Sequence, residues 1–250
     1  MILRDTAPMS RDIVSLAETK AKLGGYLRNY EPALFVTSSI STGYITDVYA
    51  WRDGHFVNIT LNPESGMSEQ TYRLTNNVGL KDINGDNVLE LPRPMAFPDL
   101  KKSGGADNFW SIQWVQYDID GQMWPVYTTY YNSDDGWYLI LPAEWQNMIT
   151  PDYVGEKITL SRRDSASSGE RAVVFSMWDG AETSDAIPFL TVYKLTGPNR
   201  TTRSKLGNRF ILAVENDAIY AAEFATDGWN CGMTQEDLIN NFRFIQPDLT

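Results

Sequence analysis

Short segments rich in apolar, β-branched and aromatic residues dominate the second half of the sequence. Such runs, bounded by turn residues, are typical of strands. Asp-Gly pairs at 120–121, 135–136 and 179–180 mark chain reversals and favour antiparallel pairing over helical crossovers. The pattern predicts strands at Trp110–Tyr117, Met123–Tyr131, Trp137–Leu141, Lys157–Ser161, Ala172–Met177, Phe189–Lys194, Phe210–Val214 and Ala218–Phe224.

The first half carries one helical pattern and one hairpin pattern. Ser10 as a cap, apolar residues at helical spacing and a Gly-Gly stop predict an amphipathic helix over residues 10–23. Further on, β-rich runs at Tyr44–Trp51 and Phe56–Leu61 flank the pair Asp53-Gly54. Because Asp-Gly supplies the positive φ angles of a tight turn, these runs predict a β-hairpin.

Residues 91–106 hold three prolines followed by two glycines, a composition that disfavours both helices and sheet ladders. We place a domain boundary there, between an N-terminal domain over residues 1–105 and a C-terminal domain over residues 106–250. The predicted fold class is α+β with predominantly antiparallel β structure. The first domain combines the helix with a blade-like sheet, and the second is a β-rich α+β domain.

Short helices are expected in the second domain at Pro142–Met148 and at residues 198–206. A clearer helix begins at Thr234, where Asp237 takes the place of the usual Glu in a capping box.

The amino-acid composition limits the partners, metal sites and catalytic groups that the chain can have. The 250 residues include 21 Lys and Arg against 32 Asp and Glu, a net charge of -11 that disfavours nucleic acid and anionic membranes as partners. A single cysteine and a single histidine leave no disulfide and too few soft ligands for zinc, haem or iron–sulfur sites. Any catalytic triad or dyad with an imidazole base would have to use His55.

One segment, residues 82–90, has the pattern of a cation-binding loop. Oxygen-bearing side chains stand at its first, third, fifth and ninth positions, and Gly85 permits a sharp turn between them. Its three crowded carboxylates repel one another unless they are solvated or neutralised, and Ca²⁺ would supply that neutralisation. The expected ligands are the side chains of Asp82, Asn84, Asp86 and Glu90 and the carbonyl of Val88.

The loop is not an EF-hand, because Arg93 stands at the twelfth position and Asn87 at the sixth. Its spacing resembles the Asp-x-Asp-Gly-Asp-Gly-x-x-Glu loops of FG-GAP/VCBS-type repeats, which join strands of β-propeller blades and bind calcium. Asn87 replaces the second Gly of that motif and can still adopt a left-handed conformation. The alternative interpretation is an Asx-rich turn that holds no metal.

The resemblance extends over most of the chain after about residue 33. The stretches that carry it are GYITDVYAWRDGHFVNIT, VQYDIDGQ, DGWYLILPAEW, ERAVVFSMWDG and FLTVYKLTG. They are similar to a group of uncharacterised FG-GAP-like lipoproteins of Gram-positive bacteria, which implies an exported, cell-surface protein. The chain shows neither a lipobox nor a second acidic loop, and taken as written it would be cytoplasmic. GWYLILPAEW is also similar to the opening of PsbP/Mog1-like α/β domains.

Several other residues with possible chemical roles are explained by plain structural ones. We expect His55 to be an exposed turn residue and Cys231 to be a packed free thiol. The aromatic residues between Trp110 and Trp145 fit cross-strand packing, with an exposed recognition patch as the alternative. The carboxylates that could be paired for glycosidase chemistry are Asp118, Asp120, Asp134, Asp135 and Glu144.

These observations favour a non-enzymatic, calcium-stabilised binding or structural module of a bacterial surface protein. Its ligand would be a glycan or a protein, and no segment of the chain is apolar enough to span a membrane. The alternative function is a hydrolase of cell-wall or dietary polysaccharide that uses paired carboxylates.

Overall fold

The computed structural model describes residues 5–74, 78–98, 109–150, 152–165, 167–181 and 183–245, with only the backbone for residues 16–24. Contacts divide the chain into two compact units. Unit 1 comprises residues 1–94 and 112–127, and unit 2 comprises residues 95–111 and 128–250. Each unit is therefore discontinuous in sequence.

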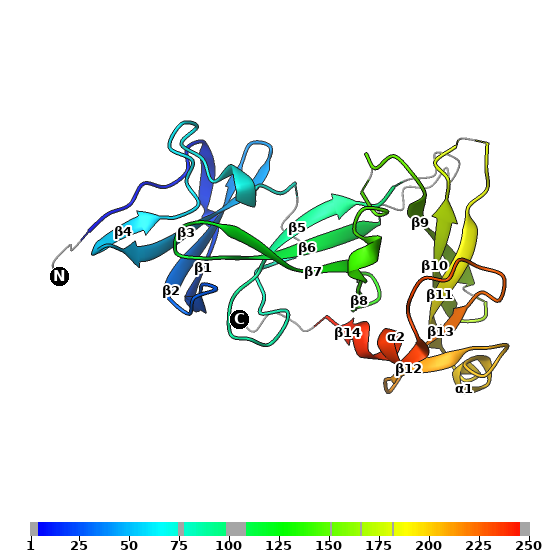
Figure 1. Cartoon of the computed structure of the whole chain (residues 1–250). Coiled ribbons are helices and arrows are strands. Elements are labelled where there is room, and N and C mark those ends of the chain that lie inside the picture. The colour runs from blue at the N-terminus through cyan, green and yellow to red at the C-terminus, as the bar shows by residue number, and fades with distance from the viewer. Residues whose placement is uncertain are drawn as a thin grey trace. The chain divides into compact units, whose positions relative to one another are not determined.

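Unit 1 contains a four-stranded antiparallel sheet with its strands in sequence order (Figure 1). The strands are β1 (Ile13–Tyr26), β2 (Pro32–Ile40), β3 (Gly43–Arg52) and β4 (His55–Asn58). The predicted hairpin is confirmed as β3 and β4. Its turn residues Asp53 and Gly54 have φ angles of 53° and 81°, both positive as a tight hairpin turn requires.

The helix predicted over residues 10–23 is wrong, because this segment forms most of β1. β1 pairs with β2 in an antiparallel register that includes Lys22↔Phe35 and Gly25↔Ala33. Hydrogen bonds to a neighbouring strand override a weak local helical pattern. Ser10 is not a helix cap, since its amide and its hydroxyl both donate to the carboxylate of Asp47.

Asp47 links several parts of unit 1 from a fully buried position on β3. Its carboxylate accepts hydrogen bonds from Ser10 N (3.1 Å) and Ser10 Oγ (2.6 Å), from Asn58 Nδ2 (2.8 Å) and from Ser68 Oγ (2.6 Å). The segment before β1, the strand β4 and the loop after β4 are thus fastened to one side chain.

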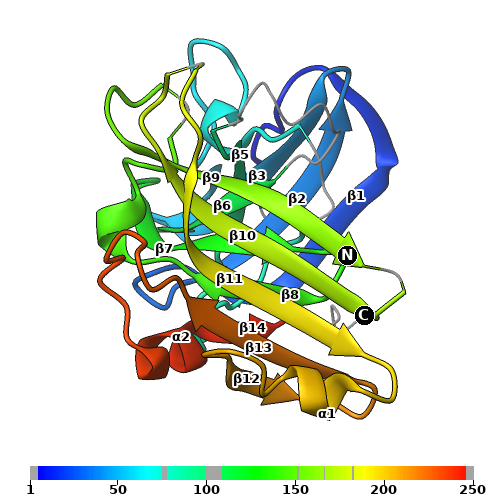
Figure 2. The same cartoon turned by 90° about the vertical axis from the view of Figure 1, so that its right-hand side faces the viewer.

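Unit 2 contains a five-stranded antiparallel sheet in the order β12-β13-β11-β10-β9, which faces the viewer in Figure 2. Its strands are β9 (Lys157–Ser165), β10 (Glu170–Trp178), β11 (Ile187–Thr196), β12 (Phe210–Val214) and β13 (Ala218–Phe224). The predicted bounds of β12 and β13 agree with these, and the other three strands are longer than predicted.

A third sheet has the order β14-β8-β7-β6-β5. Its strands are β5 (Leu91–Ala96), β6 (Trp110–Tyr117), β7 (Met123–Asn132), β8 (Trp137–Ile140) and β14 (Phe242–Phe244). The expectation that residues 91–106 avoid sheet structure is wrong for β5, which contains Pro92 and Pro94. β5 lies at a sheet edge, where the missing proline N–H groups cost no ladder bond. Residues 99–106 lie outside the described part.

The unit boundaries pass through β5, β6 and β7. The division at residues 105 and 106 stays a prediction, because the units are defined by packing and not by independent folding.

Helices are few in the described residues. The α-helices are α1 (Arg200–Arg203) and α2 (Gln235–Asn241), and 3-10 turns span η1 (Glu69–Thr71) and η2 (Ala143–Trp145). The predicted capping box is confirmed: the Thr234 hydroxyl accepts from Asp237 N, and the Asp237 carboxylate accepts from Thr234 N. Predominantly antiparallel β structure is therefore confirmed, whereas the helical part of the predicted α+β class is small.

Neither the closed ring of a propeller nor a helix long and apolar enough to cross a bilayer occurs among the described residues.

Most of the predicted aromatic set lies in the interior. Trp114, Tyr130, Trp137, Tyr138 and Trp145 are buried. In unit 2, the rings of Tyr130 and Trp137 meet edge to face with centroids 5.2 Å apart, as aromatic pairs prefer. Trp124 differs from these five, since 44% of its surface is exposed.

The Asp47 network gives a first prediction. Asp47→Ala should lower the free energy of unfolding by about 3 kcal/mol, because several buried donors lose their acceptor together. Urea denaturation measures the loss. Glu64→Ala, which removes an exposed carboxylate from the same unit, should change the value by less than about 0.5 kcal/mol. Equal effects of the two substitutions would contradict the role given to Asp47.

Candidate functional site

The acidic loop of unit 1 is closed at its base by an antiparallel bridge. Lys81 N donates to Glu90 O (3.2 Å), and Glu90 N donates to Lys81 O (2.8 Å). Within the loop, Gly85 and Asn87 have φ angles of 79° and 67°. Asn is among the side chains that tolerate this left-handed conformation best, so Asn87 can replace a glycine here.

The loop is attached to β1 at its second half. Val88 forms a parallel bridge with Tyr26, and Leu89 N donates to Tyr26 O at 3.2 Å. A Cβ atom at Gly25 would lie 2.4 Å from Leu89 Cδ1. Glycine at this position therefore lets the loop approach the strand closely.

Asp82 organises the backbone of the loop. Its Oδ1 accepts from Gly85 N (2.7 Å) and Asp86 N (3.0 Å), and its Oδ2 accepts from Asn87 N (2.9 Å). Asn84 adds a similar contact, since its Oδ1 accepts from Asp86 N at 3.0 Å. Side-chain oxygens that accept backbone N–H groups two to five residues ahead hold a tight turn in one conformation.

Gln116 of β6 connects the two remaining carboxylates. Its Nε2 donates to Asp86 Oδ2 at 2.8 Å and to Glu90 Oε1 at 2.6 Å. Glu90 is fully buried at 0% exposure, and its Oε2 accepts from Ile83 N at 2.8 Å. One neutral amide thus lies between two acidic groups, one of which has no access to solvent.

The environments of these two carboxylates shift their pKa values in opposite directions. Burial raises the pKa of Glu90 to about 7; hydrogen bonds from Ile83 and Gln116 act against this, and the charge of Asp86 adds to it. Burial alone would also raise the pKa of Asp86, but hydrogen bonds from Val88 N, Asn84 and Gln116 and the charge of Arg28 outweigh it. The pKa of Asp86 is therefore lowered.

The hydrogen bonds described above link the predicted ligands Asp82, Asn84, Asp86 and Glu90 to one another and to the backbone of their loop. Their donor set consists of hard oxygens and suits Ca²⁺, and a carboxylate oxygen that accepts one hydrogen bond retains a lone pair. Within the described ranges, no group of three His, Cys, Asp or Glu side chains is close enough in its present arrangement to bind one metal ion. The amide of Gln116 occupies the position between Asp86 and Glu90.

Sequence reasoning missed Gln116. It lies 26 residues beyond Glu90, on a strand, and is 3% exposed. The only signal for it was a polar residue between Val115 and Tyr117 on a predicted strand.

A polar hollow of about 300 Å³ adjoins the loop within unit 1. Its walls combine both charges, amide groups, one phenol ring and apolar side chains. The lining residues are Arg28, Tyr30, Asn84, Asp86, Val88, Gln116, Pro125 and Val126. Asp86 and Gln116 thus belong both to the hydrogen-bond network of the loop and to the wall of the hollow.

Arg28 is held at the rim of this hollow. Its guanidinium carbon lies 4.6 Å from the ring centroid of Trp124, a cation–π distance, and its amide donates to Tyr117 O at 2.9 Å. The indole Nε1 of Trp124 in turn donates to Asp118 Oδ2 at 2.9 Å. The ring under Arg28 is therefore itself fixed.

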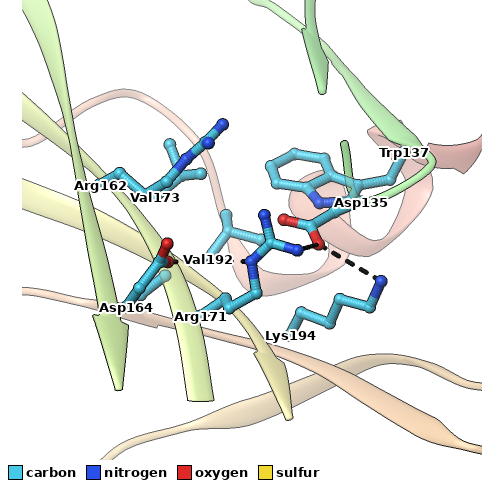
Figure 3. Close-up of a pocket in the computed structure, with 9 residues that line it drawn as sticks. Asp135, Trp137, Arg162, Asp164, Arg171, Val173, Val192 and Lys194 are labelled. Carbon is cyan, nitrogen blue, oxygen red and sulfur yellow. Dashed lines mark ion pairs between the residues drawn. The ribbon is translucent and has the colours of Figure 1, made fainter. Parts of the chain in front are cut away.

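A second polar cluster, in unit 2, surrounds the buried Asp135. Figure 3 shows its carboxylate between Arg171 and Lys194. Asp135 Oδ1 lies 2.9 Å from Arg171 Nη1 and 3.3 Å from Lys194 Nζ, and Arg171 also faces Asp164 at 3.8 Å. The space among these side chains does not admit a water-sized molecule. This arrangement fits an ion network that joins the turn after β7 to the sheet, and not a ligand site.

The other carboxylates considered for hydrolysis have local roles or face solvent. Asp118 accepts from Asp120 N and Gln122 N within a turn. Asp134 pairs with Arg162 at 3.0 Å. Asp120 and Glu144 are exposed.

The histidine and the cysteine lie as expected. His55 has a 75% exposed side chain, and its Nδ1 lies 3.5 Å from Asp5 Oδ2. Cys231 is buried, and burial raises the pKa of its thiol, which makes it a poor nucleophile.

No protein-family model matches the sequence, and comparison with curated proteins and with solved structures finds no match.

The buried Glu90 predicts a pH dependence of stability in metal-free protein. The folded state retains this proton up to about pH 7, whereas the unfolded chain releases it near 4.5. The contribution of Glu90 to stability is thus fully present below pH 4.5 and is lost as the pH rises through about 7. Glu90→Gln cannot ionise, so its unfolding free energy should fall less steeply over that interval.

Urea denaturation at a series of pH values, in the presence of EDTA, measures this difference. Glu64→Gln is the matched control, since it neutralises an exposed glutamate and should keep the wild-type slope. Parallel curves for wild type and Glu90→Gln would contradict the assignment.

Proposed function

We propose that the chain is a non-enzymatic, calcium-stabilised binding module of a bacterial cell-surface protein. The observation that carries this proposal is the convergence of Asp86 and the buried Glu90 on one nitrogen of Gln116, in a loop already shaped by Asp82. A buried carboxylate is costly in its charged form unless a cation or several donors compensate it.

A hard divalent cation suits this arrangement better than the amide does. The amide offers one polarised N–H to each carboxylate, whereas Ca²⁺ neutralises charge and accepts six to eight oxygen ligands. Binding would exchange the two hydrogen bonds of Gln116 for ion–oxygen contacts to Asp86 and Glu90. Asp82 and Asn84 lie in the same loop, and the carbonyl of Val88 completes the predicted set.

The role of such an ion would be structural. It would fasten the loop, whose last residue Glu90 directly precedes β5, and it would stabilise the folded state by mass action. Calcium loops of extracellular modules bind with dissociation constants of about 10⁻⁴ to 10⁻³ M. Such affinities suit the millimolar calcium outside cells, which agrees with the surface location implied by the FG-GAP-like resemblance.

The second candidate, a polysaccharide hydrolase, has one observation in its favour. The pKa values of Asp86 and Glu90 are shifted apart, as in pairs that divide acid and base roles. Glycosidases need both carboxyl groups to flank the substrate. Glu90 does not line the hollow and is fully buried, so Asp86 alone faces a molecule bound there. The geometry thus supports binding better than hydrolysis.

Calcium should raise the thermal midpoint of unfolding. At a hundredfold excess over the dissociation constant, linkage gives about 2.7 kcal/mol, which corresponds to a rise of roughly 5 to 10 °C for a chain of this size. Asp86→Ala should lose this rise. Differential scanning calorimetry in EDTA and in about 10 to 100 mM CaCl₂, a hundredfold excess over dissociation constants of about 10⁻⁴ to 10⁻³ M, measures it.

Asp120→Ala is the control, because it removes an exposed carboxylate of the same unit from outside the loop. It should keep the full rise. The calcium proposal fails if wild type shows no rise, or if Asp86→Ala rises as much as wild type does.

A further inference from the structure

Tyr30 stands at the rim of the hollow in an unfavourable backbone conformation. Its φ angle is 61°, in the left-handed region that favours glycine or asparagine, and its side chain is 61% exposed. The turn between β1 and β2 imposes this angle, since Leu27 N donates to Glu31 O and Tyr30 N donates to Leu27 O. A glycine would satisfy the turn at lower cost, and backbone strain of this kind clusters at ligand sites.

The walls of the hollow have the chemistry of a site for a neutral polar molecule. Asp86 contributes an acceptor, Arg28 contributes donors, and the amide of Asn84 contributes both. One acidic and one basic side chain face the hollow, and their charges offset each other, which suits a ligand without net charge. Pro125 and Val126 add apolar surface to the same lining that includes Tyr30.

We propose that this hollow binds a single neutral sugar ring of a glycan, with Tyr30 against the apolar C–H face of the ring and Asp86 and Arg28 on its hydroxyl groups. The inference deepens the proposed function, since it names the ligand class of the module whose acidic loop forms one wall. It rests on that function only in requiring the loop to keep its shape.

A sugar ring matches both kinds of surface in the hollow. Its hydroxyl groups donate to a carboxylate and accept from a guanidinium, while its C–H groups pack on aromatic and aliphatic side chains. The volume of about 300 Å³ is at the lower end of small-molecule sites, which suits one ring and not a long polymer segment. The hollow is open to solvent, so the rest of a glycan can continue outward.

The guanidinium of Arg28 is preorganised for this role. Its position over Trp124, whose indole is hydrogen-bonded to Asp118, limits the rotamers it can adopt before a ligand arrives. Groups held in place before binding lose less entropy on binding. Trp124 also supplies an optical signal close to the site.

The test uses the full chain in millimolar CaCl₂ and, as probes, the methyl glycosides of glucose, galactose, mannose and N-acetylglucosamine. Saturation-transfer NMR detects binding, and tryptophan fluorescence titration gives the dissociation constant. We expect at least one of these glycosides to bind. Methyl glucuronide carries a negative charge near Asp86 and should bind more weakly than methyl glucoside.

Tyr30→Gly is the informative variant, because glycine relieves the strained φ angle while it removes the ring. We expect the dissociation constant to rise about tenfold or more, with a thermal midpoint equal to or above that of wild type. Trp51→Ala, which removes another exposed aromatic side chain of unit 1 from outside the hollow, should bind as wild type does.

Absence of binding for all four neutral glycosides overturns the inference, as does wild-type affinity in Tyr30→Gly or tighter binding of the glucuronide. Failure of the proposed function looks different. If calcium does not stabilise the protein but Tyr30-dependent glycoside binding persists, the calcium proposal falls and the sugar site stands. If calcium stabilises the protein and no glycoside binds, the sugar site alone falls.

Discussion

The geometry of the acidic loop depends on the buried residue Glu90. The backbone of Glu90 closes the loop by pairing with Lys81. One oxygen of its carboxyl group accepts from Ile83 near the start of the loop, and the other accepts from Gln116 of β6. A polar group without solvent access must find partners in the protein. Satisfying this single residue therefore fixes where the loop begins, where it ends and which strand it faces.

Asp86 connects the buried Glu90 to the solvent-exposed hollow. It shares the amide of Gln116 with Glu90, and it also lines the hollow at whose rim Tyr30 stands. A change at the buried end of the network, such as exchange of the amide for a cation, would therefore reach the wall of the hollow through one residue. Stabilisation of the fold and arrangement of a ligand site would then depend on the same few hydrogen bonds.

The sequence predicted best where structure is determined locally. Short apolar and aromatic runs located β12 and β13, and the capping pattern at Thr234 located α2, because each depends on neighbouring residues. The segment that became β1 was misjudged, since its strand conformation comes from pairing with β2. The spacing of acidic and amide residues in the sequence identified the acidic loop. Gln116 and Tyr30 come near this loop only in the folded chain, so no local sequence pattern reveals them.

The most direct test of calcium binding by the acidic loop is a crystal structure of the protein crystallised in the presence of calcium. Diffraction data collected at a long wavelength would give an anomalous difference map that locates the ion. The account predicts a calcium peak in the loop, with oxygens of Asp82, Asp86 and Glu90 at about 2.3 to 2.6 Å and the Gln116 amide displaced from between the last two. A map with no peak there, and with Gln116 still donating to both Asp86 and Glu90, would contradict it.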